Sequence, residues 1–80
     1  MSQINYELQC FGLLTELIGE ATLLESPENL SVEALKARLL QDHHQLAGIP
    51  IKVAQDNELL SDQHVLKPGK LSIFPPFSGG

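Results

Sequence analysis

The stretch Leu30–Leu40, LSVEALKARLL, decides the fold, because it predicts the one long helix of the chain. Ser31 is a favourable N-cap residue, since its hydroxyl can accept a hydrogen bond from a backbone N–H of the first turn. Leu30 and Leu35 have the spacing of a hydrophobic staple, and Glu33 lies where the helix dipole favours an acidic side chain. We therefore expect a helix that begins directly after Ser31.

One face of this helix is predicted to be apolar and to cover a sheet. The apolar stripe consists of Val32, Leu35, Leu39 and, as an extension, Leu40. The helix is expected to fray near His43 and His44, with Gly48 as the residue just past its end. Pro50 would block any continuation.

The segment before the helix predicts two strands. Apolar and polar residues alternate along Ile4–Cys10, the pattern of a strand buried on one face. Leu13–Gly19 has helix-like apolar spacing and ends in a glycine that can cap a short helix. Ala21–Glu25 predicts a second strand, antiparallel to the first because the connection is short, and Ser26–Asn29 predicts a loop.

The segment after the helix predicts two or three more strands. One begins at Ile51, and the chain should then reverse over Gln55–Glu58, because Asp and Asn tolerate the left-handed conformation. Leu59–Leu60 could form a short edge strand. Lys67–Lys70 has Pro and Gly at the central positions of a type II turn, and a last strand should follow over Leu71–Phe74. The element order predicts an α+β fold with one helix across a mixed sheet.

The chain ends in a segment that we expect to project from the domain. Residues 1–74 are predicted to form the domain and residues 75–80, PPFSGG, an extended tail. Pro75 and Pro76 cannot continue a sheet ladder, and they favour an extended course. Gly79 and Gly80 are slim enough to enter a narrow channel, and six residues past Phe74 reach at most roughly 20 Å.

Two stretches carry a family resemblance. The Pro-Pro-x-x-Gly-Gly ending resembles that of the small, sulfur-carrying subunits of molybdopterin synthase, within the ubiquitin-like β-grasp family. The Phe11–Gly12 pair and the stretch Thr15–Gly19, TELIG, are also similar to this family, although Thr15 stands where a basic residue is usual. The resemblance implies a β-grasp fold and a role in molybdenum cofactor biosynthesis.

The resemblance also implies the chemistry of the tail. An adenylating enzyme related to ubiquitin activators would use ATP to form an acyl-adenylate at Gly80. A sulfur donor protein would then displace AMP, and the thiocarboxylate would give its sulfur to precursor Z inside the large catalytic subunit of a heterotetrameric synthase. The residues implied to enter the partner with Gly80 are Pro75, Pro76, Phe77, Ser78 and Gly79. Phe77 lies beyond both prolines and should contact the partner, whereas core packing and partner contact both stay open for Phe74.

Composition excludes several other classes of function. A formal net charge of −5 over 80 residues argues against nucleic acid as a partner, because phosphate binding needs clustered Lys and Arg. No membrane-length apolar run or signal peptide is visible, so we expect a cytoplasmic protein. Cys10 is the single cysteine, expected to be a small buried residue. The adjacent histidines, His43 and His44, would point about 100° apart on a helix, so we expect no metal site.

No catalytic constellation of side chains stands out, so we expect a sulfur-donating subunit without a bound cofactor or catalytic side chains of its own. Two alternatives share the tail chemistry: a thiamine-type sulfur carrier and a ubiquitin-like protein modifier. Thiamine carriers tend to lack the Leu13–Gly19 helical turn and the Pro-Pro pair. A third alternative is a non-reactive docking module whose tail only occupies a groove.

Overall fold

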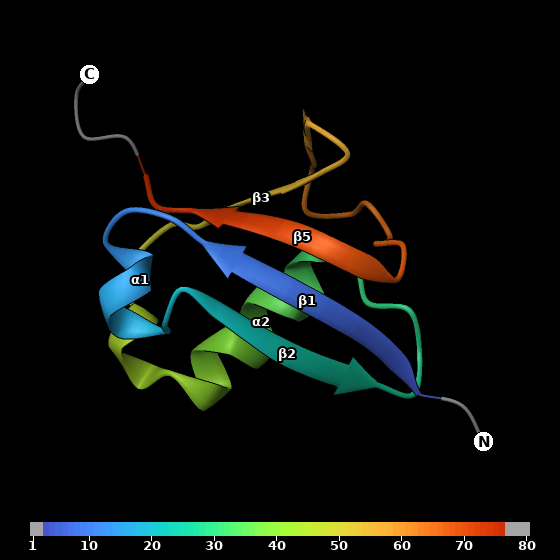
Figure 1. The fold of residues 1–80 in the computed structure, drawn as a ribbon, viewed down its shortest axis with the longest axis horizontal. Coiled ribbons are helices and arrows are strands. Elements are labelled where there is room, and N and C mark those ends of the chain that lie inside the picture. The colour runs from blue at the N-terminus through green and yellow to red at the C-terminus, as the bar shows by residue number, and fades with distance from the viewer. Residues whose placement is uncertain (1–2, 77–80) are drawn as a thin grey trace.

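The computed structural model describes residues 3–76, which form a mixed sheet of five strands with one main helix across it (Figure 1). The strands are β1 (Ile4–Cys10), β2 (Ala21–Ser26), β3 (Lys52–Gln55), β4 (Glu58–Leu59) and β5 (Gly69–Phe74). The helices are α1 (Leu14–Leu17), α2 (Val32–Asp42) and a 3₁₀ turn over His44–Leu46. The predicted α+β class and the predicted order of elements are confirmed.

The last strand lies in the middle of the sheet. The strand order is β2-β1-β5-β3-β4, so β5 has a hydrogen-bonded neighbour on each side. It runs parallel to β1 and antiparallel to β3, and β1 pairs antiparallel with β2. Because β1 and β5 are parallel, their C-terminal ends reach the same edge of the fold.

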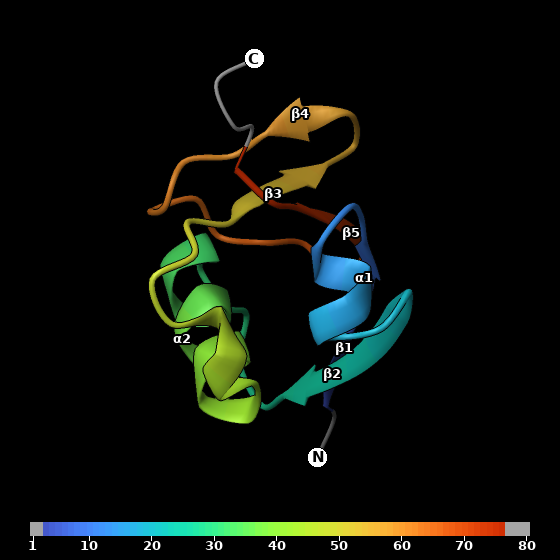
Figure 2. The same cartoon turned by 90° about the vertical axis from the view of Figure 1, so that its left-hand side faces the viewer.

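Helix α2 and the sheet form two layers with the core between them (Figure 2). The alternation in β1 sends every second side chain into this core, as the period of a strand requires. On the helix, Val32, Leu35 and Leu39 are buried. Leu40 is not part of this face, since 42% of it is exposed, and that prediction was wrong. At 3.6 residues per turn, Leu40 is rotated away from the sheet by about 100° relative to Leu39.

The start of α2 is capped as predicted. Ser31 Oγ accepts a hydrogen bond of 3.1 Å from the backbone N–H of Ala34. The backbone N–H groups of Val32 and Glu33 donate to carbonyl oxygens of the loop before β5, at His64 and Asp62. This loop therefore satisfies helix donors that would otherwise lack partners.

The C-cap residue that ends α2 is His43, which has a non-helical backbone, so the predicted end of the helix near His43 and His44 is confirmed. The chain continues into the 3₁₀ turn, so Gly48 follows that turn rather than the α-helix, and the predicted role of Gly48 was wrong. Ser26 was predicted in a loop but belongs to β2. Its buried hydroxyl donates to the carbonyl oxygen of Glu28 at 2.7 Å and also accepts from the N–H of Glu28.

The hairpin between β3 and β4 turns at Asp56 and Asn57, which both have positive φ, so the predicted reversal is confirmed. The chain turns at Pro68 into β5, whose first residue is Gly69 at φ +115°, as glycine allows, so the strand begins two residues before the predicted Leu71. Gln55 fastens that turn: its Oε1 accepts from the N–H of Lys67, and its Nε2 donates to the Lys67 carbonyl at 2.8 Å. This nearly buried amide ties the end of β3 to the start of β5.

Candidate functional site

The point where the chain leaves the sheet is the base of the predicted tail. Strand β5 ends at Phe74, where its last ladder partner is Lys52 of β3. On the other side, the turn between β1 and α1 lies beside this exit (Figure 1). The backbone N–H of Phe11 donates to the carbonyl of Ile73 at 3.1 Å, which extends the contact between the two segments past the end of β1.

Two aromatic rings stack at this exit. The rings of Phe11 and Phe74 have centroids 4.9 Å apart and an angle of 12° between their planes. Such a stack contributes about 0.5–1.5 kcal/mol beyond the apolar area that it buries. The structure therefore gives Phe74, which is half-buried, a packing role within the domain.

Gly12 makes room for the first proline of the tail. It has φ +57°, and a Cβ at this position would lie 3.0 Å from Pro75 Cγ, closer than ordinary van der Waals contact. Pro75 is accordingly half-buried, whereas Pro76 is exposed. The carbonyl of Gly12 accepts hydrogen bonds from the backbone N–H and from Oγ1 of Thr15, at 3.0 and 2.8 Å. The first turn of α1 thus holds the loop against which Pro75 packs.

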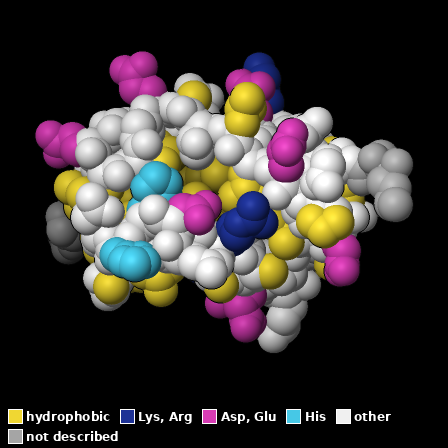
Figure 3. Space-filling model, turned by 90° about the horizontal axis from the view of Figure 1, so that it is seen from below, with side chains coloured by type: hydrophobic (Ala, Val, Ile, Leu, Met, Phe, Trp, Pro, Cys, Tyr) yellow, Lys and Arg dark blue, Asp and Glu magenta, His cyan; other side chains and the backbone are white. Residues whose placement is uncertain are grey.

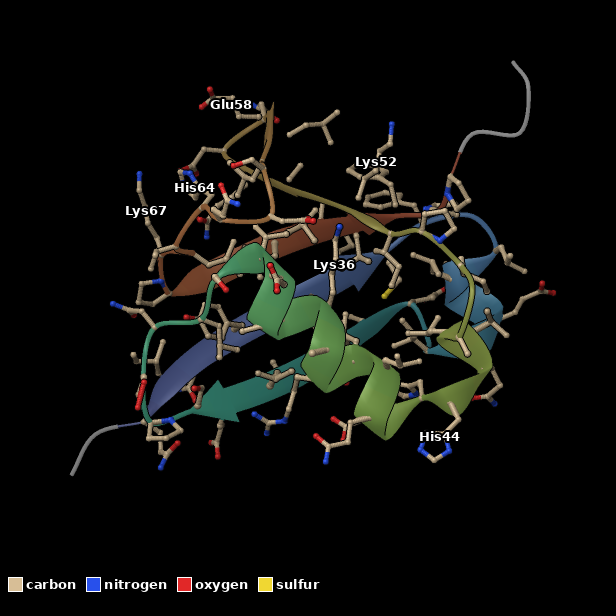
Figure 4. The ribbon with its side chains drawn as sticks, turned by 180° about the vertical axis from the view of Figure 1, so that it is seen from behind. Lys36, His44, Lys52, Glu58, His64 and Lys67 are labelled. Carbon is tan, nitrogen blue, oxygen red and sulfur yellow. The ribbon has the colours of Figure 1, made fainter. Side chains whose placement is uncertain are left out.

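The face of the sheet opposite α2 has an apolar hollow next to the exit. Its volume is about 350 Å³, and its lining comes from three adjacent strands and a turn: Lys52, Ala54, Asn57, Leu59, Ser72 and Phe74. Leu59 of β4 is 62% exposed and adds an apolar side chain to the rim of this hollow. Lys52 lies at the same end of the molecule as the chain exit (Figure 4). The hollow and the exit share Phe74.

The sequence did not lead us to Phe11, Gly12 and this hollow as parts of one site. The Phe11–Gly12 pair stood out only through the family resemblance, and its contact with Phe74 and Pro75 depends on the parallel pairing of β1 with β5. The remaining tail residues that we predicted to act, Phe77, Ser78, Gly79 and Gly80, lie outside the described residues.

The described part of the chain, residues 3–76, has no group of three or more His, Cys, Asp or Glu side chains that could hold a metal ion. His44 lies near the end of α2, far from His64 in the loop on the other side (Figure 4). On the face of the molecule that Figure 3 shows, the acidic side chains are spread out rather than gathered in one patch.

Cys10 is buried at the end of β1, as predicted. Burial raises the pKa of its thiol above the ordinary value of 9.0, because an apolar environment disfavours the thiolate. A thiol that stays protonated and inaccessible is a poor nucleophile, so Cys10 belongs to the packing of the core.

The sequence model of the ThiS family matches residues 8–80, which is most of the chain and includes the tail. The chain belongs to the ThiS family. ThiS-family sulfur carriers work with partner enzymes, and the chain is of the sulfur-carrier or ubiquitin-like modifier kind. A search of curated proteins gave no match.

Solved structures show that this ThiS-family chain has the ubiquitin-like β-grasp fold. SAMP1 from Haloferax volcanii has a TM-score of 0.76 at 23% identity, over 95% of this chain and 99% of that one. A putative molybdopterin converting factor, subunit 1, from Pyrococcus furiosus has 0.77 at 20% identity, over 92% and 99%. The ubiquitin-like domain of Dsk2 from Plasmodium falciparum has 0.66 at 14% identity, over 94% and 100%. The predicted β-grasp fold is confirmed.

No helix within residues 3–76 has the length and apolar character that a membrane crossing needs.

Proposed function

We propose that this protein is the sulfur-carrying subunit of a molybdopterin synthase. The observation that carries the proposal is the route of the chain: β5, held on both sides in the middle of the sheet, leaves it through Pro75 and Pro76. The stretch after Pro76, Phe77–Gly80, contains the glycine pair Gly79 and Gly80. A rigid domain with a short, slim arm suits delivery of a terminal carboxylate into a partner's active site.

The proposed chemistry takes place at the carboxylate of Gly80. An adenylating partner joins this carboxylate to the α-phosphate of ATP and releases pyrophosphate, which turns a poor electrophile into an acyl-adenylate. Sulfide from a donor protein attacks the acyl carbon, and AMP leaves with the electron pair of the broken bond. The product is a thiocarboxylate, whose sulfur goes to precursor Z in the large catalytic subunit. ATP is thus used by the partner, and this chain needs no cofactor.

The domain contributes binding and orientation in this scheme. The apolar hollow beside Phe74 gives a partner a second contact next to the arm, with Leu59 as its most exposed apolar side chain. Electrostatic steering by the net charge of −5 would favour a basic surface around the partner's channel. One structural neighbour is a putative molybdopterin converting factor, subunit 1, which supports a role in molybdopterin synthesis.

The test is the intact mass of the protein after incubation with its host's adenylating enzyme, ATP and sulfide. We expect one oxygen to be replaced by sulfur, within the C-terminal peptide that contains Gly80. Reactions without ATP, and a variant that lacks Gly80, are the controls and should show no change. An unmodified wild-type protein beside an adenylating enzyme that is active on its own substrate would contradict the proposal.

A second candidate is a ubiquitin-like protein modifier, favoured by the structural similarity to a small archaeal modifier protein, and a third is a thiamine-type carrier, favoured by the ThiS family match. These three candidate functions are distinguished by mixing the thiocarboxylate form with precursor Z and the large synthase subunit. Formation of the dithiolene supports the first proposal. Gly80 joined instead to lysine amines of other proteins supports a modifier, and sulfur transfer confined to the thiazole-forming enzyme supports a thiamine carrier.

A further inference from the structure

The direction of the tail depends on how its base is held. Pro75 and Pro76 each fix their own φ, so a tilt at Pro75 is carried on through Pro76. A tilt of about 20° over these two residues, roughly 6 Å of extended chain, would displace the far end of Pro76 by about 2 Å. The residues between Pro76 and the carboxylate of Gly80 must then make up this error to reach a catalytic site, where about 1 Å matters.

Strand pairing does not reach far enough to hold Pro75. The last ladder pair of β5 is Lys52 with Phe74, and a proline has no N–H to extend the ladder. Gly12 lies next to Pro75, so close that a Cβ on Gly12 would be 3.0 Å from Pro75 Cγ, and the ring of Phe11 stacks on the ring of Phe74. Both contacts come from one loop, whose carbonyls accept hydrogen bonds from Leu14 and Thr15 at the start of α1.

We propose that Phe11 and Gly12 are positioning residues: together they clamp Phe74 and Pro75 and so fix the direction in which the tail leaves the sheet. The role of this clamp in sulfur transfer rests on the proposed function. Phe11 acts through the stack, and Gly12 acts through the absence of a side chain where Pro75 packs. Neither residue takes part in the chemistry at Gly80.

The test compares two variants of the clamp with two matched controls. Phe11→Ala removes the stack, and Phe11→Tyr keeps an aromatic ring in its place. Gly12→Asn puts a side chain against Pro75, while asparagine still tolerates a positive φ. Gly48→Asn is the control for backbone strain, because Gly48 also has positive φ, at +80°, but a Cβ added there would meet no neighbouring atom within 4 Å.

The first measurement is the steady-state rate of thiocarboxylate formation as the concentration of the carrier is varied. We expect Phe11→Ala and Gly12→Asn to raise KM about fivefold or more with kcat within twofold, because a misdirected tail must be ordered on docking. Phe11→Tyr and Gly48→Asn should match the wild type. Wild-type kinetics in both clamp variants, or an equal KM increase in Gly48→Asn, would overturn the proposal.

The second measurement uses the free protein and does not depend on sulfur chemistry. Nuclear Overhauser effects between Gly12 Hα and the Pro75 ring, and Cα–Hα residual dipolar couplings of Pro75 and Pro76, report the direction of the exit. We expect Gly12→Asn and Phe11→Ala to change these couplings while those of β1 and β5 stay as in the wild type. Unchanged couplings would overturn the clamp even if sulfur is transferred. If sulfur transfer fails in the wild type but the couplings change, the proposed function is wrong and the clamp stands.

Discussion

Replacing Leu35 with alanine should remove a large part of the stability of the domain. The side chain is fully buried, with 0% exposure, in the core between α2 and the sheet. Deleting such a side chain costs the transfer free energy of its lost methyl and methylene groups plus that of the cavity, about 2–5 kcal/mol. A domain of this size has about 5–15 kcal/mol in total. A loss of about 3 kcal/mol would lower Tm by roughly 12–24 °C.

Leu40→Ala is the matched control, since it makes the same chemical change on the same helix. Leu40 is 42% exposed, so its truncation should cost less than about 1 kcal/mol, and the higher helix propensity of alanine offsets part of that. Urea unfolding followed by far-ultraviolet circular dichroism measures both, and this probe suits a chain without tryptophan. Equal losses at the two positions, with unchanged m values, would refute the assignment of the buried helix face.

Three further predictions follow from single groups. Adding one residue after Gly80 should abolish thiocarboxylate formation without changing Tm, because the carboxylate is moved out of register; intact mass detects any sulfur that is still incorporated. Tyr6→Phe should lower the free energy of unfolding, measured in urea, by about 1–3 kcal/mol, because the backbone N–H of Leu30 donates to the buried Tyr6 hydroxyl at 2.9 Å. A free energy equal to that of the wild type within error would show that water replaces the hydroxyl as the acceptor. Burial raises the pKa of Cys10 above 9.0, so the unfolded chain loses the thiol proton at a lower pH than the folded protein does. The free energy of unfolding should therefore fall as the pH rises past 9.0. In denaturation curves taken at several pH values, Cys10→Ala should lose less of its free energy of unfolding than the wild type as the pH rises. An equal pH dependence in the variant and the wild type would contradict this prediction.

The elements that the sequence predicts well are those determined by neighbours along the chain. Ser31 accepts the hydrogen bond expected of an N-cap, because that bond spans three residues. Asp56 and Asn57 both adopt positive φ, as expected of residues whose short polar side chains tolerate it. In β1 the alternation of apolar and polar residues along the sequence predicts which side chains are buried. Each of these features depends on local geometry, which a single sequence contains.

The features that the sequence does not reveal depend on pairing between distant segments. The parallel pairing of β1 with β5 has no local signature, yet it decides that Phe11 meets Phe74. Gln55 was expected only as a residue of the reversal, but its side chain fastens the turn at Lys67, which lies far along the chain. Leu40 is a different case: it was placed on the buried stripe because it is apolar and adjoins Leu39, although one step of about 100° around the helix turns it away from the sheet.

The central position of β5 matters for how the arm can work. An edge strand has ladder bonds on one side only and frays from its end, whereas β5 is paired with β1 on one side and β3 on the other. Under the proposed function, a partner that draws in the tail would pull on a strand that is held along both edges, so unpairing this strand would cost ladder bonds on two sides. The partner would then have to approach the domain closely enough to cover Phe74 and the hollow beside it. Recognition of the folded domain and delivery of Gly80 would in this way be coupled.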